Sequence, residues 1–366
     1  MSRGILATVH LDNIQHNLAV ARRYAPGKRV WAVVKANAYG HGLVPVARHL
    51  ASLADGLAVA TLDEALALRG AGVQTPILLL EGVVSAAQTQ TALHADLELV
   101  IHTPEQVIWL AASTVPTPIR VWMKLDTGMY RLGLSADEVT SVYASLVALP
   151  GVRDVAFMSH YASADEPEKD VTEQQAALFY ARLPQQAIGA RSPITCSLAN
   201  SAGTLLWPDL QGDWVRPGIM LYGASPSATE PAATWGLKAG MTLTASVIAL
   251  RDLPSGEGVG YGATFTSSAP LRLATVAMGY ADGYPRHAPS GTPAWLLGRR
   301  VHTVGRVSMD MLTVDVTQVP EVRIGDPVEL WGTHVPVDEV ARQCGTIGYE
   351  LLARLSIRGR YHYSAA

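Results

Sequence analysis

The stretch "RVWAVVKANAYGHG", Arg29 to Gly42, places a lysine directly after an unbroken apolar run. Such a run, bounded by turn residues, predicts a strand that is buried on both faces of a parallel sheet. A chain usually continues such a strand with another apolar residue or ends it with a turn residue, and not with a cation. Lys35 either reaches into solvent or stands in a functional site, and the rest of the sequence must decide between these two interpretations.

The composition of the 366-residue chain excludes several classes of protein. With 49% hydrophobic residues it can bury a large core, which excludes intrinsic disorder, and its length suggests two domains. A net charge of -3 without a dense Lys and Arg cluster argues against a nucleic-acid partner. The apolar runs are too short to span a membrane, and the N-terminus lacks the apolar region of a signal peptide. The two cysteines lack metal-binding spacing, so we expect a cytoplasmic protein without a metal, nucleic-acid or membrane partner.

Short apolar runs alternate with amphipathic segments, such as "LDEALALRGAG", through the chain up to Gly223. The predicted strands span residues 29–35, 56–61, 76–82, 97–103, 119–126, 155–160, 194–200 and 214–223. Strands that alternate with helices, in this number, predict a (β/α)8 barrel, also called a TIM barrel, and therefore the α/β fold class.

The amino-acid composition of the chain changes after Gly223. The segment "ASPSATEPAATWG", Ala224 to Gly236, is rich in Pro, Ser, Ala and Thr and predicts a linker. Beyond it, short strand-like runs separated by Gly and Pro precede one helical segment, "VDEVARQC". We therefore predict a cofactor-binding barrel over residues 1–236 and a C-terminal, mostly-β domain over residues 237–366.

Polar side chains stand at the carboxyl ends of the predicted barrel strands, where such barrels carry their reactive groups. They are Lys35, Lys124, Asp126, His160, Asn200 and Arg216. At the mouth of a barrel, low dielectric and neighbouring cations would lower the pKa of a lysine. A glycine-flanked turn leads from Lys35 into the next predicted helix, and an amine beside such an anion-binding turn suits a phosphorylated aldehyde.

Three further features admit more than one interpretation. Ser201, in "ANSAG", could hold a phosphate group, although many such turns only cap helices. Arg131 lies in a glycine-rich loop, where it could bind a carboxylate or simply face solvent. Arg216 is embedded in an apolar strand without an adjacent partner, and a lone His160 is more often structural than catalytic.

Motifs spread in order over nearly the whole chain resemble the alanine racemases, which are fold-type III pyridoxal phosphate enzymes. They are "VVKANAYGHG", "KLDTGMYRLG", "MSHYASAD", "WVRPGIMLYG", "GYGATF", "GYADGYPRHA", "GRVSMDM" and "GYELL". The resemblance implies a racemase that interconverts L-alanine and D-alanine, with pyridoxal 5'-phosphate as cofactor. It leaves open whether D-alanine is supplied for cell-wall peptidoglycan or degraded.

The resemblance also implies roles for individual residues. Lys35 would bond covalently to the cofactor, and Lys35 and Tyr261 would be the two catalytic acid/base groups that racemisation requires on opposite faces of the substrate. Arg216 would face the pyridine nitrogen with His160 behind it. The remaining cofactor-binding residues would be Tyr39, Asn200, Ser201, Gly218, Ile219 and Tyr349.

For the substrate, the resemblance implies that Arg131 and the backbone amide of Met309 hold the carboxylate. Lys124 matches a lysine that is often carbamylated in the family and that positions Arg131. Asp310 and Tyr280 would have supporting roles, Tyr280 in the lining of a narrow access channel. Family members are homodimers with shared active sites, so Tyr261 and Met309 would act in the site of the partner chain.

Other functions remain as alternatives. A racemase for a wider range of amino acids, or a decarboxylase of the same fold type, would use much of the same machinery. A barrel that binds the cofactor without turnover would have no second domain. An aldolase-type lysine without a cofactor would leave the phosphate turn and Arg216 unexplained.

Overall fold

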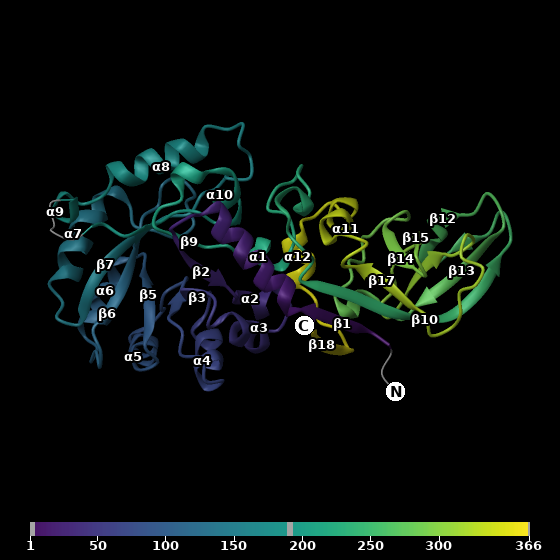
Figure 1. The fold of residues 1–366 in the computed structure, drawn as a ribbon, viewed down its shortest axis with the longest axis horizontal. Coiled ribbons are helices and arrows are strands. Elements are labelled where there is room, and N and C mark those ends of the chain that lie inside the picture. The colour runs from purple at the N-terminus through teal and green to yellow at the C-terminus, as the bar shows by residue number, and fades with distance from the viewer. Residues whose placement is uncertain (1–3, 189–192, 365–366) are drawn as a thin grey trace. The chain divides into compact units, whose positions relative to one another are not determined.

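The computed structural model describes residues 4–188 and 193–364 of the chain. It contains two compact units (Figure 1). The first, here called the barrel unit, comprises Asn17–Ala38 and Gly42–Leu221. The second, here called the β unit, comprises Met1–His16, Tyr39–His41 and Tyr222–Ala366. The division of the chain near residue 236 stays a prediction.

The barrel unit is built on an eight-stranded parallel sheet in the order β8-β7-β6-β5-β4-β3-β2-β9. Its strands are β2 (Arg29–Val33), β3 (Gly56–Val59), β4 (Ile77–Leu79), β5 (Leu97–Ile101), β6 (Ile119–Lys124), β7 (Val152–Met158), β8 (Cys196–Ser197) and β9 (Trp214–Val215). The first strand pairs with the last, with Arg29 opposite Trp214. The predicted α/β barrel is confirmed.

The last two barrel strands are much shorter than the sequence predicts. The gap between β8 and β9 is bridged by Arg216 N, which donates to Ala199 O at 2.9 Å. The hydroxyl of Ser197 also donates to Trp214 O at 2.8 Å. Residues after each strand leave the ladder to form turns and helix caps, so apolar runs overestimated the strand lengths.

Helices alternate with these strands along the chain and surround the barrel in Figure 1. They are α1 (Leu11–Tyr24), α3 (Leu43–Leu50), α4 (Leu62–Gly70), α5 (Ala86–His94), α6 (Pro104–Ala111), α7 (Ala136–Val147), α8 (Val171–Ala181), α9 (Gln185–Ile188), α10 (Ser201–Leu206) and the 3-10 turn η1 (Pro208–Leu210). The short element α2 (Lys35–Tyr39) has a left-handed backbone from Ala36 to Tyr39. Thr61 caps α4, and Glu64 completes a capping box there. Within the described residues, no helix has the length and apolar character needed to cross a membrane.

Three tryptophans fill the interior of the barrel. Trp31 of β2 stacks on Trp214 of β9 with ring centroids 4.5 Å apart, and Trp122 of β6 packs edge-on against both at 6.0 Å. Since β6 lies on the opposite side of the barrel from β2 and β9, these rings meet across its centre. Gly56 makes room for them, because a Cβ there would lie 2.0 Å from the Trp31 ring.

The β unit contains a second eight-stranded sheet in the order β13-β16-β15-β14-β17-β10-β1-β18, and β13 also pairs with β10. Its strands are β1 (Leu6–His10), β10 (Met241–Leu253), β13 (Leu271–Val276), β14 (Pro293–Leu296), β15 (Arg299–Thr303), β16 (Leu312–Asp315), β17 (Pro327–Trp331) and β18 (Arg360–Ser364). Except for the parallel pair β1 and β18, neighbouring strands are antiparallel. The prediction of a mostly-β C-terminal part is confirmed.

Smaller elements complete the β unit. A two-stranded ribbon, β11 (Gly258–Val259) with β12 (Phe265–Thr266), encloses the turn η4 (Tyr261–Ala263). The other turns and helices are η2 (Ile219–Tyr222), which begins in the barrel unit, η3 (Ala232–Trp235), η5 (Tyr280–Asp282), α11 (Val337–Gln343) and α12 (Gly348–Ala353).

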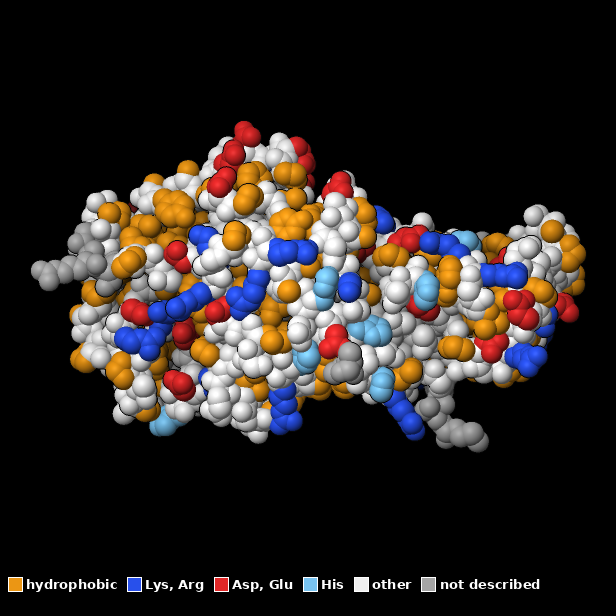
Figure 2. All heavy atoms as spheres, viewed as in Figure 1, with side chains coloured by type: hydrophobic (Ala, Val, Ile, Leu, Met, Phe, Trp, Pro, Cys, Tyr) orange, Lys and Arg blue, Asp and Glu red, His pale blue; other side chains and the backbone are white. Residues whose placement is uncertain are grey.

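On the face shown in Figure 2, basic and acidic side chains are interspersed and no continuous basic band is visible.

Candidate active site

Lys35 follows the first barrel strand in an unusual backbone conformation. The sequence predicts a strand through Lys35, but β2 ends at Val33 and a left-handed turn follows. The φ angles of the four residues after the lysine are 53° at Ala36, 55° at Asn37, 53° at Ala38 and 50° at Tyr39. Each non-glycine residue in this conformation costs about 1–2 kcal/mol, so surrounding contacts must stabilise the turn.

Hydrogen bonds from two directions stabilise this turn. Ala36 N donates to the carboxylate of Glu64 at 2.6 Å. The side chain of Asn37 accepts from Leu43 N at 2.8 Å, and its carbonyl accepts from Gly42 N at 2.9 Å. The turn is thereby tied to the start of α4 and the start of α3, and Lys35 is placed at the mouth of the barrel. The role of Glu64 in this turn was missed from the sequence, although its spacing from Thr61 is that of a capping box.

Four cations and a histidine cluster at the barrel mouth. Burial, and then the charge of Arg131, lower the pKa of the partly buried Lys35. Lys124 is only 8% exposed, and burial followed by the charge of Arg216 lowers its pKa to about 8. Burial and the same arginine hold the pKa of His160 well below its usual range. The mouth is therefore a strongly positive environment with a neutral imidazole, suited to an anionic ligand.

Arg216 is 4% exposed, and each of its hydrogen bonds goes to a neutral acceptor. Nη1 donates to Ser197 Oγ at 2.5 Å, and Nη2 donates to Ser159 O at 2.6 Å and to Leu198 O at 3.1 Å. Nη2 also donates to Nδ1 of His160 at 3.2 Å, which leaves the imidazole proton on Nε2. Burial lowers the pKa of Arg216 to about 10. These contacts fix the guanidinium without neutralising its charge.

The turn after β8 and the turn after β9 meet at Ser201. Its hydroxyl oxygen accepts from Gly218 N at 2.8 Å, and the side chain is 2% exposed. Asn200 caps α10, because its Oδ1 accepts from Gly203 N at 2.9 Å. Ile219 directly follows Gly218 and is fully buried. The structure thus brings Ser201, Gly218 and Ile219 together, whereas Asn200 uses its side-chain oxygen in the helix cap.

Arg131 lies in a loop that Asp126 organises. Oδ1 of Asp126 accepts from the backbone amides of Gly128, Met129 and Tyr130 at 2.9, 3.1 and 3.2 Å. At Gly133 (φ 138°) a Cβ would lie 2.5 Å from Asp126 N, so glycine is required for this close approach. Arg131 itself is exposed, and its charge contributes to the low pKa values of both lysines. The loop thus presents a guanidinium beside the lysines.

Two further predicted residues, Tyr39 and Tyr349, lie together in the β unit. The ring of Tyr39 stacks on Tyr222 with centroids 4.8 Å apart, and its centroid lies 6.1 Å from that of Tyr349. Burial raises the pKa of Tyr39 to about 12. Its phenol therefore keeps its proton at neutral pH and can donate a hydrogen bond.

The remaining predicted residues lie on adjacent exposed loops of the β unit. Tyr280 N donates to Ser308 O at 3.1 Å, so the loop of Tyr280 lies beside the loop of Met309 and Asp310. Tyr261 is 68% exposed and Met309 is 53% exposed. The predicted site residues thus form two sets, one in each unit.

The barrel residues fit a cofactor that carries both an aldehyde and a phosphate group. Lys35 offers an amine whose pKa is lowered, as formation of a carbon–nitrogen bond requires. Arg216 offers a buried cation whose hydrogen bonds reach only neutral acceptors. Ser201 offers a hydroxyl group that can donate to a phosphate oxygen, since its own oxygen accepts from Gly218 N.

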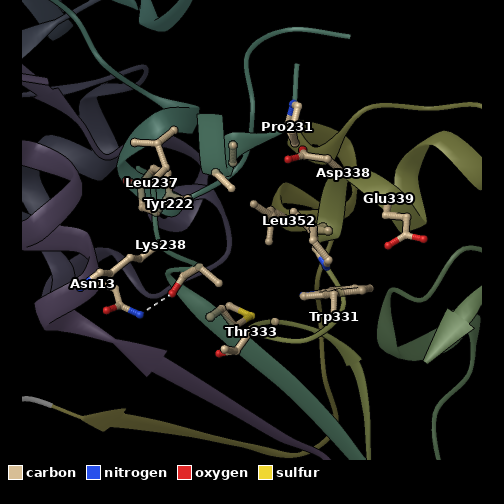
Figure 3. Close-up of a pocket in the computed structure, with 18 of the residues that line it drawn as sticks. Asn13, Tyr222, Pro231, Leu237, Lys238, Trp331, Thr333, Asp338, Glu339 and Leu352 are labelled. Carbon is tan, nitrogen blue, oxygen red and sulfur yellow. Dashed lines mark hydrogen bonds between the residues drawn. The ribbon is translucent and has the colours of Figure 1, made fainter. Parts of the chain in front are cut away.

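A cavity of about 700 Å³ lies in the β unit, and Figure 3 shows residues around it. Asn13 Nδ2 donates to Ala239 O at 2.9 Å. Asp338 accepts from Ser225 N at 2.8 Å, and burial raises its pKa to about 6. The predicted site residues are absent from its lining, so we assign the cavity no part in the reaction.

Comparison with known protein families gives two matches that together span most of the chain. The model of the alanine racemase N-terminal domain matches residues 9–226, and the model of the alanine racemase C-terminal domain matches residues 240–363. The chain is 49% identical to the biosynthetic alanine racemase of Pseudomonas aeruginosa, over 99% of both chains. It is 46% identical to an alanine racemase of Legionella pneumophila, over 99% of this chain and 100% of the other.

Solved structures resemble this one over its whole length. The crystal structure of the biosynthetic alanine racemase from Pseudomonas aeruginosa superposes with a TM-score of 0.93 at 48% identity, over 99% of this chain and 100% of that one. The structure of alanine racemase from Bacillus anthracis with bound L-Ala-P gives a TM-score of 0.86 at 33% identity, over 100% of this chain and 96% of that one.

Proposed function

The chain belongs to the alanine racemase family, and from this premise we propose that it interconverts L-alanine and D-alanine with pyridoxal 5'-phosphate as its cofactor. The observation that carries the proposal is the position of Lys35, whose amine stands at the barrel mouth among cations that lower its pKa. A small anionic substrate and an anionic cofactor both suit this environment.

The barrel residues would hold the cofactor. Pyridoxal phosphate, when bound, withdraws electrons from the substrate Cα and so makes its hydrogen acidic. Lys35 would hold the aldehyde carbon and Arg216 would face the ring nitrogen. The phosphate would be bound by the Ser201 hydroxyl, by the backbone amides of Gly218 and Ile219, and by the hydroxyls of Tyr39 and Tyr349. Asn200 would contribute from the adjacent helix cap.

Arg216 would limit side reactions. A fixed, buried cation disfavours a second positive charge nearby, so the ring nitrogen would stay unprotonated. The guanidinium cannot move away, because Ser197, Ser159 and Leu198 hold it. Electron withdrawal by the bound cofactor would then be weaker than with a carboxylate in this position, which would disfavour reactions other than proton transfer at Cα. His160 keeps the guanidinium oriented from behind.

Two acid/base groups would move the proton. The amine of Lys35 would take or return the Cα proton on one face, and the phenol of the partner's Tyr261 would do so on the other. A lowered pKa raises the fraction of Lys35 that is neutral near physiological pH, which is the form that accepts a proton. Arg131 and the backbone amide of the partner's Met309 would hold the substrate carboxylate, and Lys124 would support Arg131.

The exposed loops of the β unit favour a homodimer. Tyr261, Tyr280, Met309 and Met311 are 68, 38, 53 and 40% exposed. Large apolar and aromatic side chains gathered on one surface favour coverage by another chain, and a second copy is the commonest such partner. We propose that each active site combines one barrel with these loops of the partner, in a cytoplasmic enzyme.

The test is chiral chromatography of L-alanine incubated with the purified enzyme and pyridoxal phosphate, with L-serine in parallel. We expect an approach to an equal mixture with alanine, and little or no conversion of serine. Comparable rates with both would indicate a racemase of wider range. No conversion of either would favour a binding protein without turnover.

Deuterium exchange in D2O tests the roles of the two bases. Without the phenol of Tyr261, racemisation should stop, whereas Lys35 should still exchange the Cα hydrogen of one enantiomer. We expect the Tyr261→Phe enzyme to label one enantiomer with retained configuration and the other much more slowly. Equal labelling of both enantiomers would contradict the assignment.

A further inference from the structure

Arg358 joins two loops of the β unit through two carboxylates. Its Nε donates to Asp282 Oδ1 at 2.7 Å, and its Nη2 donates to Asp282 Oδ2 at 2.9 Å. The same Nη2 lies 2.8 Å from Oδ1 of Asp310. The Arg358 backbone amide also donates to Asp282 Oδ1 at 3.2 Å. A planar guanidinium is suited to this bidentate geometry, and a lysine cannot reproduce it.

The two carboxylates belong to loops that carry predicted site residues. Asp282 ends the turn η5, which begins with Tyr280, and it accepts from Gly279 N at 3.3 Å. Asp310 directly follows Met309 in the chain. One arginine outside both loops thus holds Asp282, two positions after Tyr280, and Asp310, directly after Met309.

The same loops also contact each other through backbone atoms. Tyr280 N donates to Ser308 O at 3.1 Å, and Ala281 N donates to Met309 O at 3.0 Å. A Cβ on Gly279 would lie 2.3 Å from Met309 O, so glycine allows this approach. The packing leaves little freedom between the loops.

The bond to Ser308 O fixes the direction of the Met309 amide. The Ser308 carbonyl and the Met309 N–H belong to one planar peptide group, and in a trans peptide they point in opposite directions. The described chain contains no cis peptide bond. Any shift of the Met309 loop against the Tyr280 loop would therefore tilt the Met309 N–H away from its direction.

The two carboxylates differ in burial, and this difference determines how strongly each loop depends on the ion pair with Arg358. The side chain of Asp282 is fully buried, whereas that of Asp310 is 44% exposed. A buried carboxylate is strongly destabilised when its cation is removed, but an exposed one is solvated by water. Loss of Arg358 should therefore disturb the Tyr280 loop most, and loss of Asp310 should release only the Met309 loop.

We propose that Arg358 is a positioning residue that aims the Met309 amide at the substrate carboxylate by joining Asp282 to Asp310. The proposal rests on the proposed function, in which that amide binds the carboxylate of alanine. Arg358 itself would touch neither substrate nor cofactor.

The test compares four variants of the holoenzyme with the unchanged enzyme. They are Arg358→Gln, Arg358→Lys, Asp310→Asn and, as a control for loss of a surface ion pair, Arg299→Gln. The measured quantities are KM and kcat for both alanine enantiomers, the inhibition constant of propionate, which has the carboxylate but no amine, and the cofactor absorbance.

For Arg358→Gln we expect KM and the propionate constant to rise together by about tenfold or more, with a smaller fall in kcat and unchanged cofactor absorbance. Arg358→Lys should recover part of the loss, and Asp310→Asn should raise both constants about threefold. Arg299→Gln should match the unchanged enzyme. If Arg358→Gln fails to fold, Asp310→Asn decides alone, because its carboxylate is exposed.

Two results would overturn the proposal. One is an unchanged KM and propionate constant in the folded variants, with only the yield or thermal stability reduced, which would make the role of Arg358 purely structural. The other is a loss of kcat alone. An unchanged enzyme that fails to racemise alanine would instead refute the proposed function, so the two failures are distinguishable.

Discussion

The two layers of side chains inside the barrel differ sharply, although they share the same strand faces. Trp122 and Trp214 each stand two residues before a cation of the mouth, Lys124 and Arg216 respectively. Residues two apart in an extended chain point to the same side. Two residues further along the chain, a charged side chain therefore follows a packed ring on the same side. The lower layer is a core, and the upper layer is the candidate active site.

The two layers have opposite effects on stability. The tryptophans bury large apolar surfaces against one another and stabilise the fold. Burial and then neighbouring cations lower the pKa values of Lys35 and Lys124, and burial lowers that of Arg216, so the charged forms of these residues are destabilised at the mouth. The barrel tolerates an unfavourable mouth because the layer beneath it is well packed.

The largest effect on function should come from Lys35→Ala. The variant loses the amine that holds the cofactor and accepts a proton, so kcat should fall by about 10⁴-fold or more. Thermal stability of the cofactor-free protein should stay equal or rise, because a destabilised cation is removed. Absorbance of bound cofactor, racemase assays and thermal melts would measure this. Turnover within tenfold of the original would contradict the role of Lys35.

The largest effect on stability should come from Trp122→Ala. Removal of the ring leaves a cavity among Trp31 and Trp214, and it deprives Glu98 of the Trp122 Nε1 donor at 2.6 Å. We expect the free energy of unfolding to fall by about 3–5 kcal/mol. Turnover per bound cofactor should remain within about threefold. The free energy of unfolding of Trp122→Phe should lie between those of Trp122→Ala and the unchanged enzyme. If Trp122→Ala lost turnover without losing stability, the tryptophan layer could not be assigned to the core alone.

The sequence predicted the layered arrangement better than its details. Most barrel strands are nearly continuous apolar runs, which made their number predictable, and the count of strands, the barrel and the alanine racemase family are all confirmed. The cations at strand ends were visible for the same reason, since a charge interrupts an apolar run. Their roles, like those of Tyr261 and Met309, stay proposals.

Other features could not be predicted, for physical reasons. The left-handed turn at Ala36–Tyr39 contains no glycine, which is the usual sequence signal for positive φ. The strand Leu6–His10 was missed because its partners lie far along the chain, with Leu6 opposite Thr244 and Arg360. The arginine Arg358 was missed because its partners are acidic residues distant in sequence.

A smaller effect on stability should come from the titration of Lys124. It depends on pH, unlike the stabilisation by the tryptophan core. Its pKa is about 8 in the folded protein, against 10.5 for a lysine exposed to water, so folding opposes its protonation. This cost is fully present below pH 8 and is lost as the pH rises from 8 to 10.5. Relative to Lys124→Gln, the cofactor-free enzyme should gain up to about 3 kcal/mol over that range.

Chemical denaturation across this pH range would measure the gain. Buffers free of carbon dioxide are needed, because a neutral lysine amine reacts with carbon dioxide to form a carbamate. A difference between the two proteins that is constant with pH would show that Lys124 is not destabilised at the mouth.

The smallest effect on stability should come from Ala36→Gly. The sign of this effect tests whether the backbone beside Lys35 is strained, in contrast to that of an ordinary helix. Ala36 is exposed with a φ of 53°, so glycine removes about 1–2 kcal/mol of backbone strain and adds about 0.5–1 kcal/mol of entropy cost. The protein should become slightly more stable. Ala87→Gly, at an exposed position of the right-handed helix α5, should lose about 1 kcal/mol.

For Ala36→Gly, activity should change in the direction opposite to stability. Ala87→Gly, in helix α5, should not change activity. The strained turn restricts Lys35 because Glu64 holds Ala36 N in one position. Glycine at position 36 would let the backbone leave that position, so kcat should fall a few-fold while the melting temperature rises. Ala87→Gly should lower the melting temperature without changing kcat. If both substitutions lowered stability and spared kcat, the strain beside Lys35 would have no part in placing the amine.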